Sequence, residues 1–171
     1  MGLDPLRIEG WMSEGELAWL AEQAAGKMTV VEMGSYKGRS AMALLSRMPV
    51  GAMLHAVDAW WDDKIYAAFR TNLREHLDAG RVTMHRATTS QAFGSLVGIE
   101  AEMVFIDAGH DYDNVVGDIQ LARILMPRGG LLCGHDYCDQ WPDVPRAVRD
   151  VVPGFKVVEG ERIWYKEVTA W

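Results

Sequence analysis

The sequence predicts an α/β fold in three layers, with helices on both faces of a mostly parallel seven-stranded sheet. Apolar strand-like runs alternate with segments of helical periodicity along the chain, which is the pattern of right-handed crossovers between parallel strands. The last two runs are joined only by Glu159-Gly160-Glu161, a turn that suits an antiparallel hairpin. We therefore expect a Rossmann-like sandwich whose C-terminal strand is antiparallel.

Each element is expected from its local pattern. The strands are predicted over Met28–Glu32, Met53–Asp58, Val82–Arg86, Met103–Asp107, Gly130–Cys133, Phe155–Val158 and Ile163–Lys166. The first helix opens with a capping box, Ser13 as N-cap and Glu16 three residues on, and runs to about Ala25 before Gly26. Periodicity predicts further helices over Arg39–Arg47, Asp63–Leu77, Ser90–Leu96, Asn114–Leu125 and Val144–Val151.

Composition limits the class of protein. At 171 residues and 49% hydrophobic, residues 1–171 suit one domain, in which residues 1–26 pack on the sheet. No apolar run approaches the roughly 18 residues of a membrane helix, and the N-terminus lacks a signal-peptide layout. A net charge of −7 without a basic stripe argues against nucleic-acid binding. We expect a cytoplasmic protein that acts on a small molecule.

A glycine-containing turn follows the first strand and opens the second helix. It reads Glu32-Met-Gly34-Ser35-Tyr36-Lys-Gly38-Arg-Ser40, and its glycines allow a sharp bend and close approach of a ligand to the backbone. It lacks both the G-x-G-x-x-G of NAD-binding domains and the Gly-Lys-Ser/Thr of a phosphate-binding loop. The acid before the turn instead favours a ligand that carries an ammonium group.

A second acid, Asp58, ends the second strand and is followed by Ala59 and Trp60. An acid at this position, roughly 20 residues past the glycines, can accept hydrogen bonds from both ribose hydroxyls. The alternative is that Asp58 only caps a turn before the Trp60-Trp61 pair.

Together these residues resemble the class I S-adenosylmethionine-dependent methyltransferases, whose first motif looks like E-x-G-x-x-x-G-x-S. The resemblance implies that Glu32 and the Gly34–Gly38 backbone lie near the methionine part of the cofactor, and that Asp58 holds its ribose. It also places Ser90 near the adenine, although Ser90 is equally expected as a helix N-cap.

Acids and histidines gather after the fourth and fifth strands. Asp107 and His110 follow the fourth strand, and His135-Asp136 follows the fifth, so the four side chains can converge above the sheet. Unpaired buried charge is costly, which argues against a role as simple core filler. Taken singly, Asp107 could cap a helix, His135 could donate in a turn, and Asp136 could form an Asx-turn.

The pattern Ile-Asp-x-x-His-x-Tyr, then Pro127-x-Gly129-Gly and Gly134-His-Asp-Tyr, resembles the small macrocin- and mycinamicin-type O-methyltransferases. The resemblance implies His110 as general base and Asp107, His135 and Asp136 as ligands of Mg²⁺. The metal-dependent members have a carboxylate where this chain has His135. Because an imidazole suits Mn²⁺ and softer metals better than Mg²⁺, the sequence leaves open a different metal or none.

The predicted function is methylation of a hydroxyl on a sugar or other natural product by S-adenosylmethionine. His110 is expected to take the hydroxyl proton, Asp107 to orient His110 or bind a metal, and Asp136 to position the acceptor or the metal. The alternatives are an NAD-binding oxidoreductase and a non-catalytic module that binds S-adenosylmethionine. Four tryptophans could wall the acceptor site or simply pack in the core: Trp11, Trp60, Trp61 and Trp141. A lid borrowed from a second subunit would make the protein a homodimer.

Overall fold

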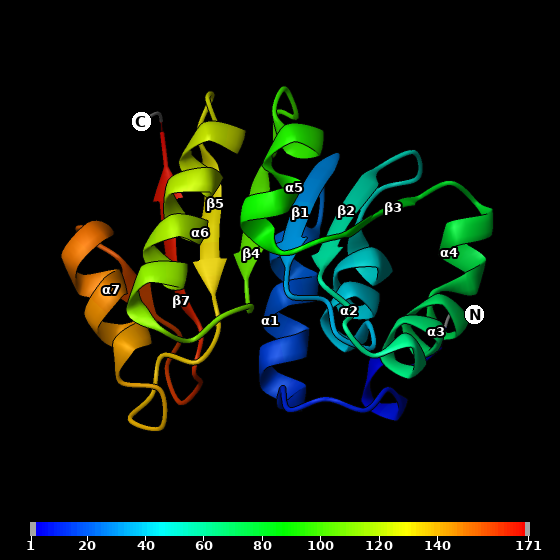
Figure 1. Ribbon diagram of the computed structural model, residues 1–171, viewed down its shortest axis with the longest axis horizontal. Coiled ribbons are helices and arrows are strands. Elements are labelled where there is room, and N and C mark those ends of the chain that lie inside the picture. Colours follow the sequence, from blue (N-terminus) through cyan, green and yellow to red (C-terminus); the bar gives the residue numbers. More distant parts are fainter. Residues whose placement is uncertain (1–2, 170–171) are drawn as a thin grey trace.

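A seven-stranded sheet in the order β3-β2-β1-β4-β5-β7-β6 forms the centre of the fold (Figure 1). It is seen in a computed structural model, which describes residues 3–169. The strands are β1 (Thr29–Met33), β2 (Met53–Asp58), β3 (Val82–Arg86), β4 (Met103–Ile106), β5 (Gly130–Gly134), β6 (Lys156–Val157) and β7 (Trp164–Val168). Only β7 runs against the others, since it pairs antiparallel with both β5 and β6. The predicted Rossmann-like sheet with an antiparallel C-terminal strand is confirmed.

Helices cover both faces of this sheet. In Figure 1, α5 (Thr89–Leu96), α6 (Tyr112–Leu125) and α7 (Asp143–Val151) lie in front of the strands. Behind them lie α1 (Glu14–Ala24) and α2 (Arg39–Arg47), and α3 (Asp63–Asn72) and α4 (Arg74–Asp78) follow β2 at the β3 edge. None of the helices within residues 3–169 is long and apolar enough to cross a membrane.

The two faces of the sheet bury two separate cores. Successive residues of a strand point to opposite faces, so Val30 packs with the α1–α2 layer and Val31 with the α5–α7 layer. The same alternation places Phe105 on the first face and Val104 on the second. This double burial explains why the strands read as continuous apolar runs.

Several element boundaries differ from the prediction. The helix expected over residues 63–77 is interrupted at Leu73, whose fully buried side chain packs close to Gly38. Helix α6 begins earlier than expected, because Asp111 caps it by accepting a hydrogen bond from the Asn114 backbone. The capping box of α1 is confirmed, with Ser13 and Glu16 each accepting the other's backbone N–H.

The N-terminal segment crosses the edge where the parallel strands end. In Figure 1 it lies below the sheet, on the side to which the carboxyl ends of β1, β2, β4 and β5 point. Arg39, in the first turn of α2, fixes it by donating to the carbonyl oxygens of Ile8 (3.0 Å) and Met12 (2.8 Å). The segment therefore closes one side of the space beyond the strand ends, where ligands bind in folds of this kind.

Candidate active site

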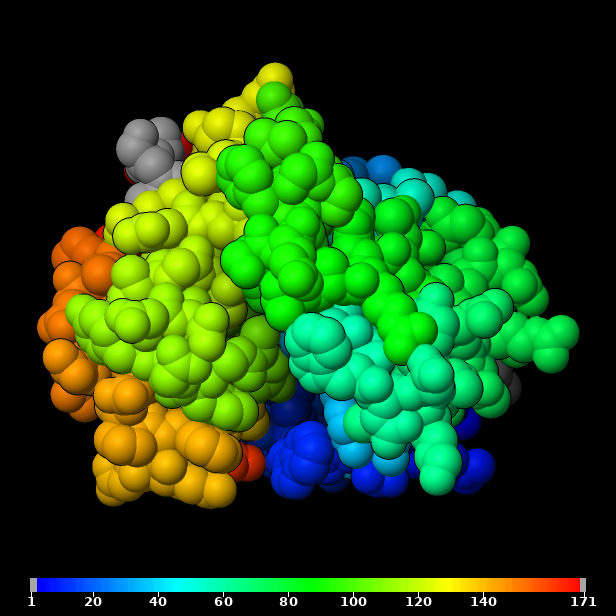
Figure 2. Space-filling model, in the orientation of Figure 1, coloured from blue at the N-terminus to red at the C-terminus, as the bar shows by residue number. Residues whose placement is uncertain are grey.

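A cavity of about 1010 Å³ lies at the carboxyl ends of the parallel strands. Figure 2 shows the hollow below its centre, between the yellow-green surface of α6 and the teal segment after β2, with blue N-terminal atoms beneath. Its volume suits a cofactor together with a small substrate. The cavity wall includes these residues expected at the cofactor end: Gly34, Ser35, Tyr36, Ser40, Asp58 and Ala59.

The glycines of the turn are required by packing of the protein against itself. Gly34 has φ of 91°, and a Cβ there would lie 2.0 Å from the carbonyl oxygen of Asp107. Gly38, the N-cap of α2, has φ of 90°, and its Cβ would meet the Leu73 side chain at 2.3 Å. The groups that lie closest to these two backbone positions are therefore neighbouring protein groups. Gly38 does not line the cavity.

Glu32 is fully buried behind the cavity wall and does not line the cavity. One carboxyl oxygen accepts a hydrogen bond from the Ser35 hydroxyl (2.5 Å), and the other, Oε1, has no hydrogen-bond partner among residues 3–169. Burial, together with the charges of Asp107 and Asp58, raises the pKa of Glu32 to about 7. Glu32 therefore supports the turn from beneath through Ser35.

Asp58 shapes the wall of the cavity with both carboxylate oxygens. Oδ2 accepts the backbone N–H of Tyr36 (2.8 Å) and Oδ1 that of Trp60 (2.7 Å). Tyr36 and Trp60 have φ of 44° and 40°, a left-handed conformation that costs about 1–3 kcal/mol for a residue with a side chain. Asp58 thus holds two strained loops and still presents lone pairs to the cavity.

The expected cofactor contact at Trp60 is not made by its side chain, which is buried and does not line the cavity. Its ring packs against Tyr66 and Phe69, and its Nε1 donates to the carbonyl oxygen of Tyr36 (2.7 Å). Trp60 is a core residue that fastens the glycine turn to the segment after β2.

The side of the cavity near α5 differs in one detail from the prediction. Ser90 lines the cavity as expected, but it lies inside the first turn of α5. Thr88 is the N-cap, and it forms a capping box with Gln91. The wall there also includes Thr88 and Phe93, which were not predicted. The pattern T-x-x-Q is a recognisable capping signal that could have placed Thr88 at the start of the helix.

His110 and Asp136 form a close pair in the opposite wall. His110 Nε2 lies 2.8 Å from Asp136 Oδ2, and this hydrogen bond raises the pKa of His110. Burial favours the neutral acid, yet hydrogen bonds from His110 and His135 lower the pKa of Asp136. Asp136 has φ of 59°, so the fold holds its backbone in a strained conformation to aim the carboxylate.

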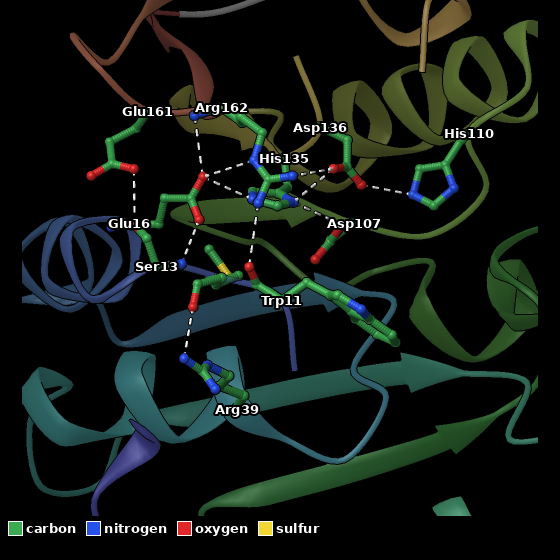
Figure 3. A network of polar contacts seen from close by, with 11 residues as sticks. Trp11, Ser13, Glu16, Arg39, Asp107, His110, His135, Asp136, Glu161 and Arg162 are labelled. Atoms are coloured by element: carbon green, nitrogen blue, oxygen red, sulfur yellow. Dashed lines mark hydrogen bonds and ion pairs between the residues drawn. The ribbon is translucent and has the colours of Figure 1, made fainter. Parts of the chain in front are cut away.

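His135 lies deeper, enclosed by carboxylates (Figure 3). Its Nε2 lies 2.9 Å from Glu16 Oε1, and its Nδ1 lies 3.3 Å from Asp136 Oδ1 and 3.6 Å from Asp107 Oδ1. Burial alone would lower the pKa of His135, but the three carboxylates raise it to about 12. Glu16 was recognised in the sequence only as a capping residue, because 119 positions separate it from its partner.

This arrangement does not favour a metal bound by Asp107, His135 and Asp136, and that ligand set stays a prediction. A metal needs a lone pair on the imidazole, whereas each ring nitrogen of His135 faces a carboxylate oxygen. Among residues 3–169, the groups that could surround a cation are Asp107, His110 and Asp136, whose ligand atoms lie within 4.8 Å of one another. A cation held by these three would displace the hydrogen bond between His110 and Asp136, and it would not use His135 as the expected site does.

Tryptophans stand at the mouth of the cavity. Trp11, Trp61 and Trp141 line it, with 73%, 82% and 37% of their surface exposed. The Trp141 ring stacks on His110, with ring centroids 4.1 Å apart and planes at 17°. Three of the four expected tryptophans thus reach the cavity, and Trp60 does not.

Residues 31–137 match the protein family described as methyltransferase domain. The chain belongs to this family. The matched region runs from β1 to the residue after Asp136, and so it holds both the glycine turn and the His110–Asp136 pair of this methyltransferase. No curated protein sequence matches the chain.

Solved structures with the same fold include three with described ligands or pathways. The cofactor-bound Rv0187 from MTB is 21% identical, with a TM-score of 0.77, over 97% of this chain and 85% of that one. The O-methyltransferase from Bacillus cereus in complex with SAH is 17% identical, with a TM-score of 0.76, over 93% and 82%. TomG from Streptomyces achromogenes, an O-methyltransferase of tomaymycin synthesis in complex with SAM, is 15% identical, with a TM-score of 0.74, over 94% and 82%.

Proposed function

We propose that this methyltransferase transfers a methyl group from S-adenosylmethionine to a hydroxyl oxygen of a small molecule, a sugar or another natural product. The observation that carries the proposal is that the His110–Asp136 pair opens into the same cavity as the Asp58 carboxylate and the Gly34 turn. A proton acceptor and a nucleoside-binding acid thus face one shared space. Structures of O-methyltransferases with SAM or SAH bound on this fold support the choice of cofactor.

The cofactor end offers matching groups for each part of S-adenosylmethionine. When bound, the cofactor supplies a methyl group on a positively charged sulfur. Asp58 would hold the ribose hydroxyls, and Ser90 would line the adenine side of the cavity. The first turn of α2, whose N-cap Gly38 provides no side-chain acceptor, leaves backbone N–H groups for the carboxylate of the methionine part. The carboxyl group of the buried Glu32, with its pKa raised to about 7, lies behind the turn and would be ionised more readily beside an ammonium group.

His110 removes the proton of the acceptor hydroxyl. Its Nε2–H donates to Asp136, which leaves Nδ1 with the lone pair that accepts the proton. The negative charge of Asp136 then stabilises the imidazolium that forms, as in other histidine–carboxylate pairs. Asp136, rather than Asp107, is therefore the residue that orients His110, and Asp107 lines the cavity beside them.

Binding calorimetry tests the cofactor assignment and its rivals. We expect one equivalent of S-adenosylmethionine or S-adenosylhomocysteine to bind and NAD⁺ to give no heat; the reverse would favour the oxidoreductase. A screen of sugars and phenols with labelled methyl donor then tests turnover. If the wild-type protein binds the cofactor but transfers methyl groups no faster than His110→Ala does, with every acceptor tested, the non-catalytic module is favoured. A homodimer stays a prediction, which sedimentation velocity tests.

A further inference from the structure

His135 is buried in the cavity wall and held between carboxylates on both edges of its ring (Figure 3). Glu16 Oε1 faces Nε2 at 2.9 Å, and Asp136 Oδ1 faces Nδ1 at 3.3 Å. A neutral imidazole has one N–H, so its other nitrogen would turn a lone pair toward a carboxylate oxygen. A doubly protonated ring turns an N–H toward the carboxylates on both edges, and the geometry therefore favours a cation at this position.

Glu16 is fixed as firmly as the ring it contacts. Its side chain is 1% exposed, and Oε1 also accepts the backbone N–H of Arg162 (3.1 Å). Its second oxygen accepts the backbone N–H of Ser13 (2.7 Å), which closes the capping box of α1. The first turn of a helix favours a negative charge. The helix start thus presents an immobile, ionised carboxylate to His135.

The charges of this cluster nearly balance without any further cation. Glu16, Asp107 and Asp136 supply three carboxylates, and His135 lies within 3.6 Å of all three. Arg162 adds a second positive group, 3.7 Å from Glu16 and 3.9 Å from Asp136.

We propose that Glu16 and His135 form a built-in cationic support that takes the place of a divalent metal beneath Asp107 and Asp136. His135 draws one oxygen of Asp136 inward, and the other oxygen is thereby aimed at His110. Glu16 is a positioning residue, since it contacts His135 and does not line the cavity. The role in methyl transfer rests on the proposed function, whereas the charge state and metal exclusion do not.

Titration with Mn²⁺ after EDTA dialysis, followed by electron paramagnetic resonance, tests metal exclusion. We expect the wild-type protein to bind no stoichiometric Mn²⁺. The double variant Glu16→Gln/His135→Asp, which replaces the cation by a carboxylate, is expected to bind Mn²⁺ at least about tenfold more tightly than wild type. Stoichiometric Mn²⁺ on the wild type, lost in Asp107→Asn, would overturn the proposal.

The ring itself provides a readout that does not depend on any variant folding. Nitrogen-15 NMR of labelled histidine is expected to show both His135 nitrogens protonated at pH 8 in the wild type, and a neutral ring would overturn the proposal. Glu16→Gln should restore a neutral ring at that pH. Glu14→Gln, an exposed carboxylate in the same turn of α1, should leave the spectrum unchanged. An unchanged spectrum in Glu16→Gln would contradict the role of Glu16.

Calorimetry with S-adenosylhomocysteine on the same samples separates this inference from the proposed function. Cofactor binding by a protein that also binds Mn²⁺ overturns the cationic support alone. A doubly protonated His135 in a protein that binds no cofactor overturns the proposed function alone.

Discussion

Replacement of Asp58 by alanine is expected to weaken cofactor binding by about 10²–10⁴-fold. The two oxygens that we assign to the ribose hydroxyls would be removed together. A hydrogen bond to a charged group contributes about 1.5–3 kcal/mol, so two of them correspond to about 3–6 kcal/mol of binding free energy. The same oxygens hold the strained backbones of Tyr36 and Trp60, at 2.8 Å and 2.7 Å. The melting temperature should therefore fall as well.

Isothermal titration with S-adenosylhomocysteine measures this change, and thermal unfolding checks that the variant is folded. Asp62→Ala is the matched control, because Asp62 also accepts a backbone N–H, that of Lys64 (2.8 Å), but lies outside the cavity. It should lose about 1 kcal/mol of stability as a helix N-cap and keep its cofactor affinity. A folded Asp58→Ala protein whose dissociation constant lies within about threefold of wild type would refute the ribose assignment.

Three further predictions follow from the other walls of the cavity. His110→Ala should slow methyl transfer by about 10²–10⁴-fold and keep its cofactor affinity. The wild-type rate should fall as the pH drops through a value above 6.5, because Asp136 raises the pKa of His110. If the pH at which the rate falls is the same in Asp136→Asn, this role of Asp136 is contradicted. Trp141→Ala should raise the KM for the acceptor and Trp141→Phe should restore it, since the ring stacks on His110; equal KM values would exclude an acceptor contact. Gly34→Ala should destabilise the protein, in urea unfolding, by clearly more than the roughly 1–2 kcal/mol expected for Gly51→Ala. Both positions have φ above 80°, but only at Gly34 does the new Cβ meet a backbone oxygen, at 2.0 Å, so equal losses would show that the clash is relieved.

Local pattern was sufficient for most elements but not for every boundary. The capping box of α1 depends on residues three apart, and it formed as predicted. The interruption at Leu73 was missed because it depends on packing beside Gly38, a residue from another element. The start of α6 was missed for a local reason, since the cap at Asp111 was not recognised.

The candidate site divides in the same way. Residues at strand ends must share one edge of a parallel sheet, so the sequence could bring Asp58, Asp107, His110 and Asp136 to one cavity. It could not reveal that Trp60 turns into the core or that Asp136, rather than Asp107, contacts His110. Those outcomes depend on side-chain directions, which the order of residues along a strand does not fix.

The sheet, its ligand-binding edge and the residue types gathered there were predictable, because they follow from periodicity and from the position of polar residues after apolar strands. The surroundings of His135 were not predictable, since they depend on contacts between distant segments. Its neighbours include Glu16, 119 positions away, and only the packing of α1 under the strand ends brings that carboxylate to the ring. His135, which the sequence predicts as a metal ligand, is thereby held as a hydrogen-bonded cation.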